Sequence, residues 1–429
     1  MKVISNLPEY IISYDPLFLI IEDETNKKGL NYVFYNSAKH IACRLNKLEL
    51  LLLDLLYQYD DIDYICGKFP SNKYEVIKCA LNFIQQNALL SHEELEVPIR
   101  TPMIPSAYYF HLTYKCNLKC TYCYNKEVRG TLKKELSIEE WYKIIDKISP
   151  FAKAITLTGG EFLLFQHSLE LVKYIKYKIP NVQLSCISNG MHDIKNPILL
   201  EVLKYIDEIT FSCDSINEAG ERVGFVPEKF KQNIITIRQL YPKLGVSISA
   251  THTYRNTDDL DSISEFCREQ KCHLRKVTLI PGHIEEIELM PDMDSIIKNM
   301  TLSYDSQNRK KYKQLPSAKF QCGAGYSTCS IDPIGNVYPC QSLHFEELLM
   351  GNILTDNIGD MRYINQKEQL LPLVNEMEAC SHCKIKYLCG GGCPANGYKL
   401  YGKFIRNKNI CPIDYHNALS RLVSLENHL

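Results

Sequence analysis

The sequence predicts an α/β fold: a partial (β/α)6 barrel of the TIM-like kind, with a winged-helix-like module before it and a cysteine-rich domain after it. Three observations lead to this prediction. The chain has 429 residues, which is too long for one ordinary core and suits two or three domains. Residues 106–284 alternate between strand-like and helix-like segments. Most of the 18 cysteines gather in two regions, one early in the barrel and one near the C-terminus.

Six strand–helix steps predict the barrel. Short apolar or alternating runs indicate strands, and amphipathic runs indicate helices. We expect strands at residues 107–113, 154–157, 183–188, 208–212, 246–251 and 274–280, with helices at 137–148, 168–178, 197–205, 229–240 and 257–270. In a curved, largely parallel sheet of this kind, chemistry collects at the C-terminal ends of the strands.

Charge and composition argue against several classes of protein. The net charge is -1, so the chain carries no strong field for nucleic acid. No apolar run reaches the length of a membrane span, and Pro8 and Glu9 stand where a signal peptide needs its hydrophobic segment. We therefore expect a cytoplasmic protein with no nucleic-acid partner and no membrane partner. In that reducing compartment, 18 cysteines indicate metal clusters rather than disulfides.

The N-terminal module, residues 1–95, is predicted to contain strands followed by helices. We expect strands at residues 17–21 and 30–35, and helices at 48–56 and from 71 onward. This order is winged-helix-like, and the most common task of that shape is reading DNA with a basic helix. The module instead holds nine Lys and Arg against thirteen Asp and Glu, which argues against DNA. A proline-containing linker, residues 96–105, follows it.

Three cysteines lie directly after the first barrel strand, at Cys116, Cys120 and Cys123. On one loop, their thiolates can converge on a point, which indicates a metal centre. Three cysteines leave one iron of a four-iron cluster open to another ligand. A zinc knuckle is the weaker alternative, because it would want a fourth Cys or His close by.

This Cys-x3-Cys-x2-Cys loop resembles the signature of the radical S-adenosylmethionine (SAM) superfamily. The resemblance implies a 4Fe-4S cluster whose open iron binds SAM, and cleavage of SAM to a 5′-deoxyadenosyl radical. Residues 158–161 resemble the GGE motif that holds the amino group of SAM, and residues after the third and fourth strands resemble further SAM contacts. The implied SAM site is Thr158, Gly159, Gly160, Glu161, Ser188, Asn189, Ser212 and Asp214. Ser215 departs from the usual glycine after Asp214. For Arg222, a surface position and a carboxylate clamp are equally compatible with the sequence.

The cysteines become dense again after a charged connector, residues 285–320. Residues 321–413 carry the spacing C-x12-G-x4-C, C-x2-C-x5-C-x3-C and a final C. This pattern resembles the SPASM domain, which implies two auxiliary 4Fe-4S clusters. The implied ligands of the first are Cys322, Cys340 and Cys393, with Cys329 as the candidate fourth, and those of the second are Cys380, Cys383, Cys389 and Cys411. A zinc ribbon is the alternative. Residues 414–429 are expected to form a C-terminal helix.

The N-terminal module resembles the PqqD-like RiPP recognition element, which binds the leader of a ribosomally made precursor peptide as an added strand. A purely structural cap is the alternative. Together, the resemblances imply a radical SAM/SPASM peptide maturase with three 4Fe-4S clusters and SAM, supplied with electrons by ferredoxin or flavodoxin. The expected product is a thioether or, as second choice, a carbon–carbon crosslink. The rival readings are a sulfatase-maturase-like enzyme that makes formylglycine, and a non-catalytic zinc protein that binds peptide or DNA. No catalytic acid or base is identified.

Overall fold

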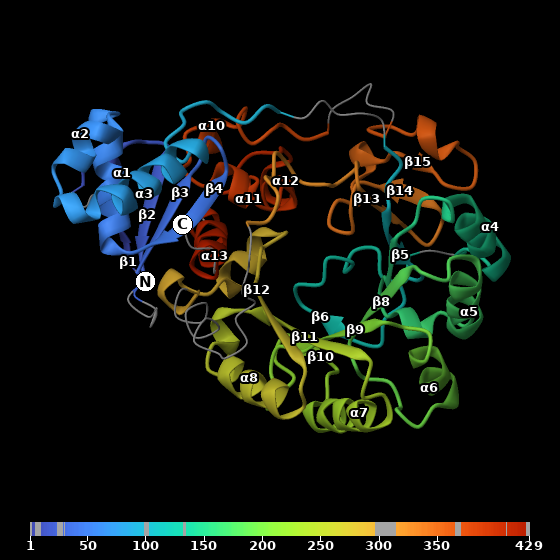
Figure 1. Ribbon diagram of the computed structural model, residues 1–429. Helices are drawn as coiled ribbons and strands as arrows, with labels where there is room; N and C mark the ends of the chain where they lie inside the picture. Colours follow the sequence, from blue (N-terminus) through green and yellow to red (C-terminus); the bar gives the residue numbers. More distant parts are fainter. Residues whose placement is uncertain are drawn as a thin grey trace.

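The computed structural model describes residues 2–4, 10–23, 29, 31–97, 103–131, 134–296, 315–364, 370–408 and 410–425. One long sheet forms its centre, and the N-terminal module lies beside the C-terminal helices (Figure 1). Parts of the predicted linker, connector and C-terminal helix lie outside the described residues, at 98–102, 297–314 and 426–429. Within the described ranges, every helix is too short or too polar to span a bilayer.

The central sheet has nine strands in the order β12-β11-β9-β8-β7-β5-β13-β14-β15. The first six are parallel and confirm the predicted partial barrel. They are β5 (Ala107–His111), β7 (Ala154–Thr158), β8 (Gln183–Ser188), β9 (Glu208–Ser212), β11 (Gly245–His252) and β12 (His273–Thr278). The cysteine-rich domain extends this sheet with β13 (Thr328–Ile331), β14 (Asn336–Tyr338) and β15 (Gly351–Asn352). The two domains therefore share one sheet.

Five helices cover the outer face of the barrel, as Figure 1 shows: α4 (Ile138–Ile148), α5 (Ser168–Lys178), α6 (Pro197–Leu203), α7 (Pro227–Leu240) and α8 (Asp259–Glu269). Successive strand residues point to opposite faces of a sheet. In β5, Phe110 faces the helices, since its ring centroid lies 5.0 Å from that of Trp141. His111 points the other way, toward His344 of the cysteine-rich domain, at 4.4 Å between centroids.

The N-terminal module is a four-stranded antiparallel sheet followed by helices. Its strands are β1 (Lys2–Ile4), β2 (Phe18–Glu22), β3 (Tyr32–Asn36) and β4 (Ile41–Leu45), and its helices are α1 (Lys47–Tyr59), α2 (Ile62–Gly67) and α3 (Tyr74–Gln86). The structure thus adds β1, β4 and α2 to the predicted elements. Phe18, Ile20 and Phe34 belong to the core shared with α1 and α3.

The opposite face of this small sheet packs against α11 (Lys386–Cys389) and α13 (Cys411–Val423). The other C-terminal helices are α10 (Glu378–Ser381) and α12 (Ala395–Tyr401). Alternate residues of β2 and β3 form one apolar core with α11 and α13, namely Leu19, Ile21, Val33, Tyr35, Ile385, Leu388, Ala418, Leu419, Leu422 and Val423. Arg44 forms a buried ion pair with Asp23 at 2.9 Å and donates to the main-chain oxygen of Leu425 at 2.5 Å. The module is therefore part of a common core with α11 and α13.

Candidate functional site

The cluster loop leaves β5 at its C-terminal end and brings Cys116, Cys120 and Cys123 together. Burial raises the pKa of Cys116, and it raises the pKa of Cys120 to about 11; Cys123 adds to both shifts through its charge. The three thiols are therefore close enough to interact. The main-chain N–H of Leu118 lies 3.4 Å from the Cys116 sulfur and donates to it. Thiols with raised pKa values become thiolates when a cationic centre binds them, so this set suits an iron–sulfur cluster.

Residues 158–161 contact the cluster loop closely through the main chain. Gly159 has a φ of 123°, and a Cβ on it would lie 2.4 Å from the carbonyl oxygen of Thr113. A Cβ on Gly160 would lie 2.2 Å from the carbonyl oxygen of Lys115. Main-chain N–H groups of Gly160 and Glu161 donate to these same two carbonyls, at 2.7 and 2.9 Å. The glycines are thus required for close approach to the cluster loop itself.

Glu161 lies shortly after the end of β7 and is 1% exposed. Its carboxylate accepts hydrogen bonds from the main-chain N–H of Asn189 at 2.8 Å and from the Ser188 hydroxyl at 3.2 Å. Asn189 reaches back to the cluster loop, because its side-chain nitrogen lies 2.7 Å from Asn117 Oδ1 and 3.7 Å from Cys116 Sγ. The structure therefore gathers three of the predicted SAM residues beside the cluster. Thr158 is buried at the end of β7.

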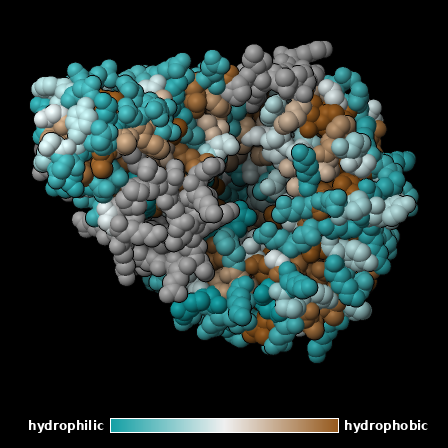
Figure 2. Space-filling model, in the orientation of Figure 1, coloured by the Kyte–Doolittle hydropathy of each residue, from teal (hydrophilic) through white to brown (hydrophobic). Residues whose placement is uncertain are grey.

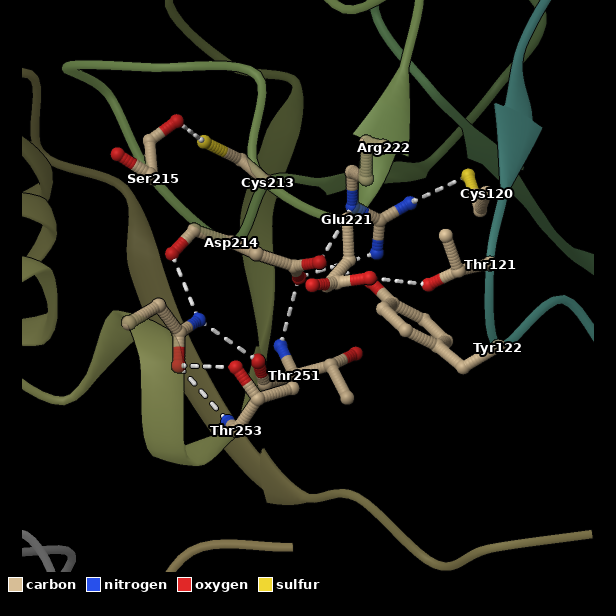
Figure 3. Close-up of polar contacts among 11 residues, drawn as sticks. Cys120, Thr121, Tyr122, Cys213, Asp214, Ser215, Glu221, Arg222, Thr251 and Thr253 are labelled. Atoms are coloured by element: carbon tan, nitrogen blue, oxygen red, sulfur yellow. Dashed lines mark hydrogen bonds and ion pairs between the residues drawn. The ribbon is translucent and has the colours of Figure 1, made fainter. Parts of the chain in front are cut away.

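Asp214 is held by groups of the chain itself (Figure 3). Its carboxylate accepts from Arg222 Nε at 2.9 Å, from Arg222 Nη2 at 3.1 Å and from the main-chain N–H of Thr251 at 2.9 Å. The Tyr122 hydroxyl donates to it as well. Ser212 lies half-buried at the end of β9. The contact between Asp214 and SAM that the resemblance implies stays a prediction, and the structure shows this carboxylate as the anchor of Arg222.

Arg222 is not a surface residue, which settles one of the alternatives that the sequence left open. It is 8% exposed and lies on β10 (Arg222–Val223), which pairs with β6 (Lys119–Cys120) so that Arg222 stands opposite Cys120. Its guanidinium lies 5.7 Å from the centre of the Tyr122 ring. The signal in the sequence was an arginine eight residues after Asp214, but nothing there revealed the pairing of two strands about a hundred residues apart.

Three of the predicted first-cluster ligands, Cys322, Cys340 and Cys393, form a second set of thiols. Burial raises the pKa of Cys340 to about 12, and the charges of Cys393 and Cys322 add to this shift. Cys322 likewise contributes to the raised pKa of Cys393. These three thiols therefore share one site.

Cys329 lies on the other side of the sheet from these three thiols. It stands opposite Tyr108 in the parallel pair of β13 and β5, and it is buried in the barrel core with Phe110 and Trp141. Tyr109, the next residue of β5, faces the opposite side; burial raises its pKa, and the charges of Cys340 and Cys322 add to the shift. The structure does not bring Cys329 to the proposed first auxiliary cluster, because the strand alternation turns its side chain toward the helices.

The four predicted second-cluster ligands line a single cavity, together with Arg406 and Tyr415: Cys380, Cys383, Cys389 and Cys411. Burial raises the pKa of Cys380 to about 11, and the other three thiols add to the shift. Arg406, which the sequence analysis missed, forms an ion pair with Asp414 at 2.7 Å and donates to the carbonyl oxygen of Gly391 at 2.8 Å. Four thiols around one cavity fit a fully ligated 4Fe-4S cluster. In the described part of the chain, no three Cys, His, Asp or Glu side chains are grouped closely enough for a single metal ion.

A cavity of about 270 Å³ lies between the barrel and helix α12. Its lining is mainly apolar, with His283, Lys399 and Asn407 among the polar residues. Burial lowers the pKa of Lys399, while the charges of Cys393 and Cys340 raise it, so Lys399 lies near the first auxiliary site. On the other side, Glu286 accepts from the main-chain N–H of Gly282 at 2.7 Å and pairs with Lys126 at 3.0 Å. The cavity therefore adjoins both the chain that follows Cys123 and the cysteine-rich domain. Figure 2 shows one face of the molecule, which is hollowed near its centre.

Comparisons with known proteins agree with these sites. Residues 110–267 match the radical SAM superfamily, and residues 322–384 match the SPASM iron–sulfur cluster-binding domain. The mycofactocin maturase MftC of Mycolicibacterium smegmatis is 26% identical over 67% of this chain and 77% of its own. The sporulation killing factor maturation protein SkfB of Bacillus subtilis is 27% identical over 65% of this chain and 68% of its own.

Solved structures share the fold. Streptococcus suis SuiB bound to S-adenosylmethionine has a TM-score of 0.55 at 14% identity, with 92% of this chain and 98% of SuiB covered. The structure of anSMEcpe with bound AdoMet has a TM-score of 0.56 at 15% identity, with 74% of this chain and 98% of anSMEcpe covered. From the matched domains and the thiol sets, the chain is a radical SAM enzyme with a SPASM-type iron–sulfur domain, and its cofactors are SAM and 4Fe-4S clusters.

Proposed function

We propose that this enzyme is a peptide maturase that installs an intramolecular thioether, or as second choice a carbon–carbon bond, in a ribosomally made precursor peptide. The observation that carries the proposal is the N-terminal sheet, which shares a core with the helices that hold Cys389 and Cys411. A peptide bound to this sheet lies next to the iron–sulfur domain. The names of similar proteins support the proposal, since MftC is a mycofactocin maturase and AlbA of Bacillus subtilis, 26% identical over 74% of this chain, is a subtilosin biosynthesis protein.

The leader of the precursor binds to the N-terminal module, which we infer to be a PqqD-like recognition element. In the described residues, β1 and β4 are the two edges of its sheet, and each pairs on one side only. An edge strand offers main-chain donors and acceptors to an extended peptide. SuiB, whose structure with its precursor peptide SuiA is solved, covers 92% of this chain.

When bound, SAM and its cluster would supply the 5′-deoxyadenosyl radical that takes a hydrogen atom from a carbon of the peptide. The residues of the chain orient the reactants: Glu161 is held by Ser188 and Asn189 at the strand ends, where it can accept from the amino group of SAM. We place part of the peptide in the cavity between residues 281–290 and α12, whose mainly apolar lining suits a peptide side chain. The product is lighter by two hydrogens, one taken by the deoxyadenosyl group and one leaving the thiol as a proton.

A bound auxiliary iron–sulfur cluster would supply the acceptor for the remaining electron. The second auxiliary site suits this role, because four thiols line its cavity and leave no iron open to substrate. The reaction also needs an external one-electron donor, for which we propose a ferredoxin or flavodoxin, and we place the enzyme in the cytoplasm.

Mass spectrometry of the precursor tests the proposal. The candidate precursor is the product of a small open reading frame beside the gene, incubated anaerobically with enzyme, reductant and SAM. We expect a loss of two hydrogens per crosslink, one 5′-deoxyadenosine per crosslink, and loss of one thiol that iodoacetamide can alkylate. A carbon–carbon bond would leave that thiol reactive. An unchanged mass with deuterium uptake from D2O would mean epimerisation and would contradict the proposal.

The two rival functions predict different outcomes. A sulfatase-maturase-like enzyme would oxidise one Cys or Ser to formylglycine in a substrate without a leader, whereas our proposal requires the leader. Adding leader peptide alone should therefore compete with the precursor and slow its processing. A zinc protein that binds peptide or DNA would be colourless and free of iron, whereas an iron–sulfur enzyme is brown when purified without oxygen.

A further inference from the structure

Arg222 brings a positive charge to one ligand of the radical SAM cluster. Its Nη1 atom lies 3.9 Å from the Cys120 sulfur, across the β6–β10 pair (Figure 3). Asp214 holds the Nε and Nη2 edge of the same guanidinium, at 2.9 and 3.1 Å. Tyr122 lies over the guanidinium and also donates to Asp214. Asp214 and Tyr122 thus hold the guanidinium, which cannot move away from the Cys120 sulfur without breaking a buried ion pair.

We propose that Arg222 is a positioning residue that raises the reduction potential of the radical SAM cluster through Cys120, and that Asp214 sets the size of this effect. Reduction adds a negative charge to the cluster and its thiolates. A nearby cation stabilises that added charge, and does so strongly at a buried site because water screens little there. The negative charge of Asp214 lowers the reduction potential, but Asp214 contacts the Nε and Nη2 edge of the guanidinium, whereas Nη1 faces Cys120.

The geometry around Cys120 agrees with this order of effects. Arg222 Nη1 faces the sulfur at 3.9 Å, whereas Asp214 contacts Nε and Nη2 on the other edge of the guanidinium. The positive member of the pair is therefore the one in contact with the sulfur. The geometry also opposes a role for Arg222 as a clamp on the carboxylate of SAM, since Asp214 occupies one edge of the guanidinium and Nη1 faces Cys120.

Electron paramagnetic resonance during a redox titration of the SAM-bound holoenzyme tests the proposal. The signal that changes on addition of SAM reports the radical SAM cluster, and the other signals report the auxiliary clusters as internal controls. For Arg222→Gln we expect the ratio of reduced to oxidised cluster at a fixed potential to fall at least tenfold, a shift of about 59 mV for one electron. For Asp214→Asn, which leaves the cation in place, we expect a shift of the opposite sign.

Arg255→Gln is the matched control. Arg255 belongs to the neighbouring network through Glu221 at 2.6 Å, but its side chain is 57% exposed and Glu221 in turn contacts Thr121 rather than the cysteine. This variant should leave the potential unchanged. Opposite shifts for Arg222→Gln and Asp214→Asn are not expected from a merely structural role, which would disturb the cluster in the same direction in both.

Three results would overturn the inference. An unchanged potential in Arg222→Gln with weaker SAM binding would make Arg222 a substrate clamp. If Arg222→Gln loses iron because Asp214 is left unpaired, the double variant Arg222→Gln/Asp214→Asn restores neutrality at this position. A reduction potential in the double variant equal to that of the wild type would also contradict the proposal. Loss of the cluster in both variants would assign Arg222 a structural role. None of these measurements uses a peptide, so their failure is distinguishable from failure of the proposed function.

Discussion

Replacing Leu422 with alanine should loosen the N-terminal sheet and helix α13 together. Leu422 is fully buried in the core that joins α13 to β2 and β3, where it packs in one cluster with Leu19, Ile21 and Val33. Helix α13 begins at Cys411, a proposed ligand of the second auxiliary cluster. The N-terminal module and the iron–sulfur domain should therefore stabilise each other.

The size of the effect follows from the atoms removed. Leu→Ala deletes three carbon groups, worth about 2.4 kcal/mol in transfer free energy, and the cavity left behind brings the loss to about 3 kcal/mol. Each 1.4 kcal/mol changes an equilibrium tenfold, so the undocked population should rise about a hundredfold. Leu48→Ala is the matched control, because Leu48 lies on α1 of the same module and is 49% exposed. We expect it to change stability by less than about 0.5 kcal/mol.

Hydrogen exchange on the intact holoenzyme measures this coupling. Amides of β2, β3 and α13 should exchange faster by a similar factor in Leu422→Ala and at the wild-type rate in Leu48→Ala. Faster exchange in α13 alone, with β2 and β3 unchanged, would refute the argument that one core holds them. The same core makes deletion of residues 1–95 a poor test of leader binding, because it would expose the apolar side chains of Ile385, Leu388, Leu419 and Leu422.

Three further outcomes are expected. Cys329→Ala should keep its iron content and lose about 1 kcal/mol of stability, whereas Cys340→Ala should lose iron; equal iron losses would contradict the placement of Cys329 in the barrel core. Burial lowers the pKa of His344 from 6.5 to about 3, so the neutral ring favours the folded state above pH 6.5, and this stability is lost as the pH falls below that value. His344 should contribute about 1.4 kcal/mol to the decrease in the free energy of unfolding between pH 8 and pH 5.5. Chemical denaturation of His344→Gln should show a smaller decrease than that of His167→Gln, a change at a side chain that is 41% exposed. Replacing Cys116, Cys120 and Cys123 together by alanine should remove about four of about twelve irons and abolish SAM cleavage. An iron assay and the formation of 5′-deoxyadenosine measure these two losses.

Local patterns in the sequence determined the class of enzyme and most of the barrel. The spacing of Cys116, Cys120 and Cys123 places three thiols on one loop, and the alternation of strands and helices predicts six parallel strands, which the structure contains. Both signals act over short distances along the chain, so they can be read without knowing how distant segments pair. The gathering of Glu161, Ser188 and Asn189 also followed, because parallel strands end at one edge of the sheet.

Only the tertiary structure decided which side chains reach which site. Cys329 was the candidate fourth ligand because the resemblance leaves the first auxiliary cluster one ligand short. The pairing of β13 with β5 turns its side chain toward the helices, and a shift of one residue would have reversed its direction. Arg222 reaches Cys120 because two short strands about a hundred residues apart are paired. The N-terminal sheet shares a core with α13 because each presents an apolar face to the other. Such contacts depend on segments distant in the chain, and their geometry is set by packing, which no local pattern of residues encodes.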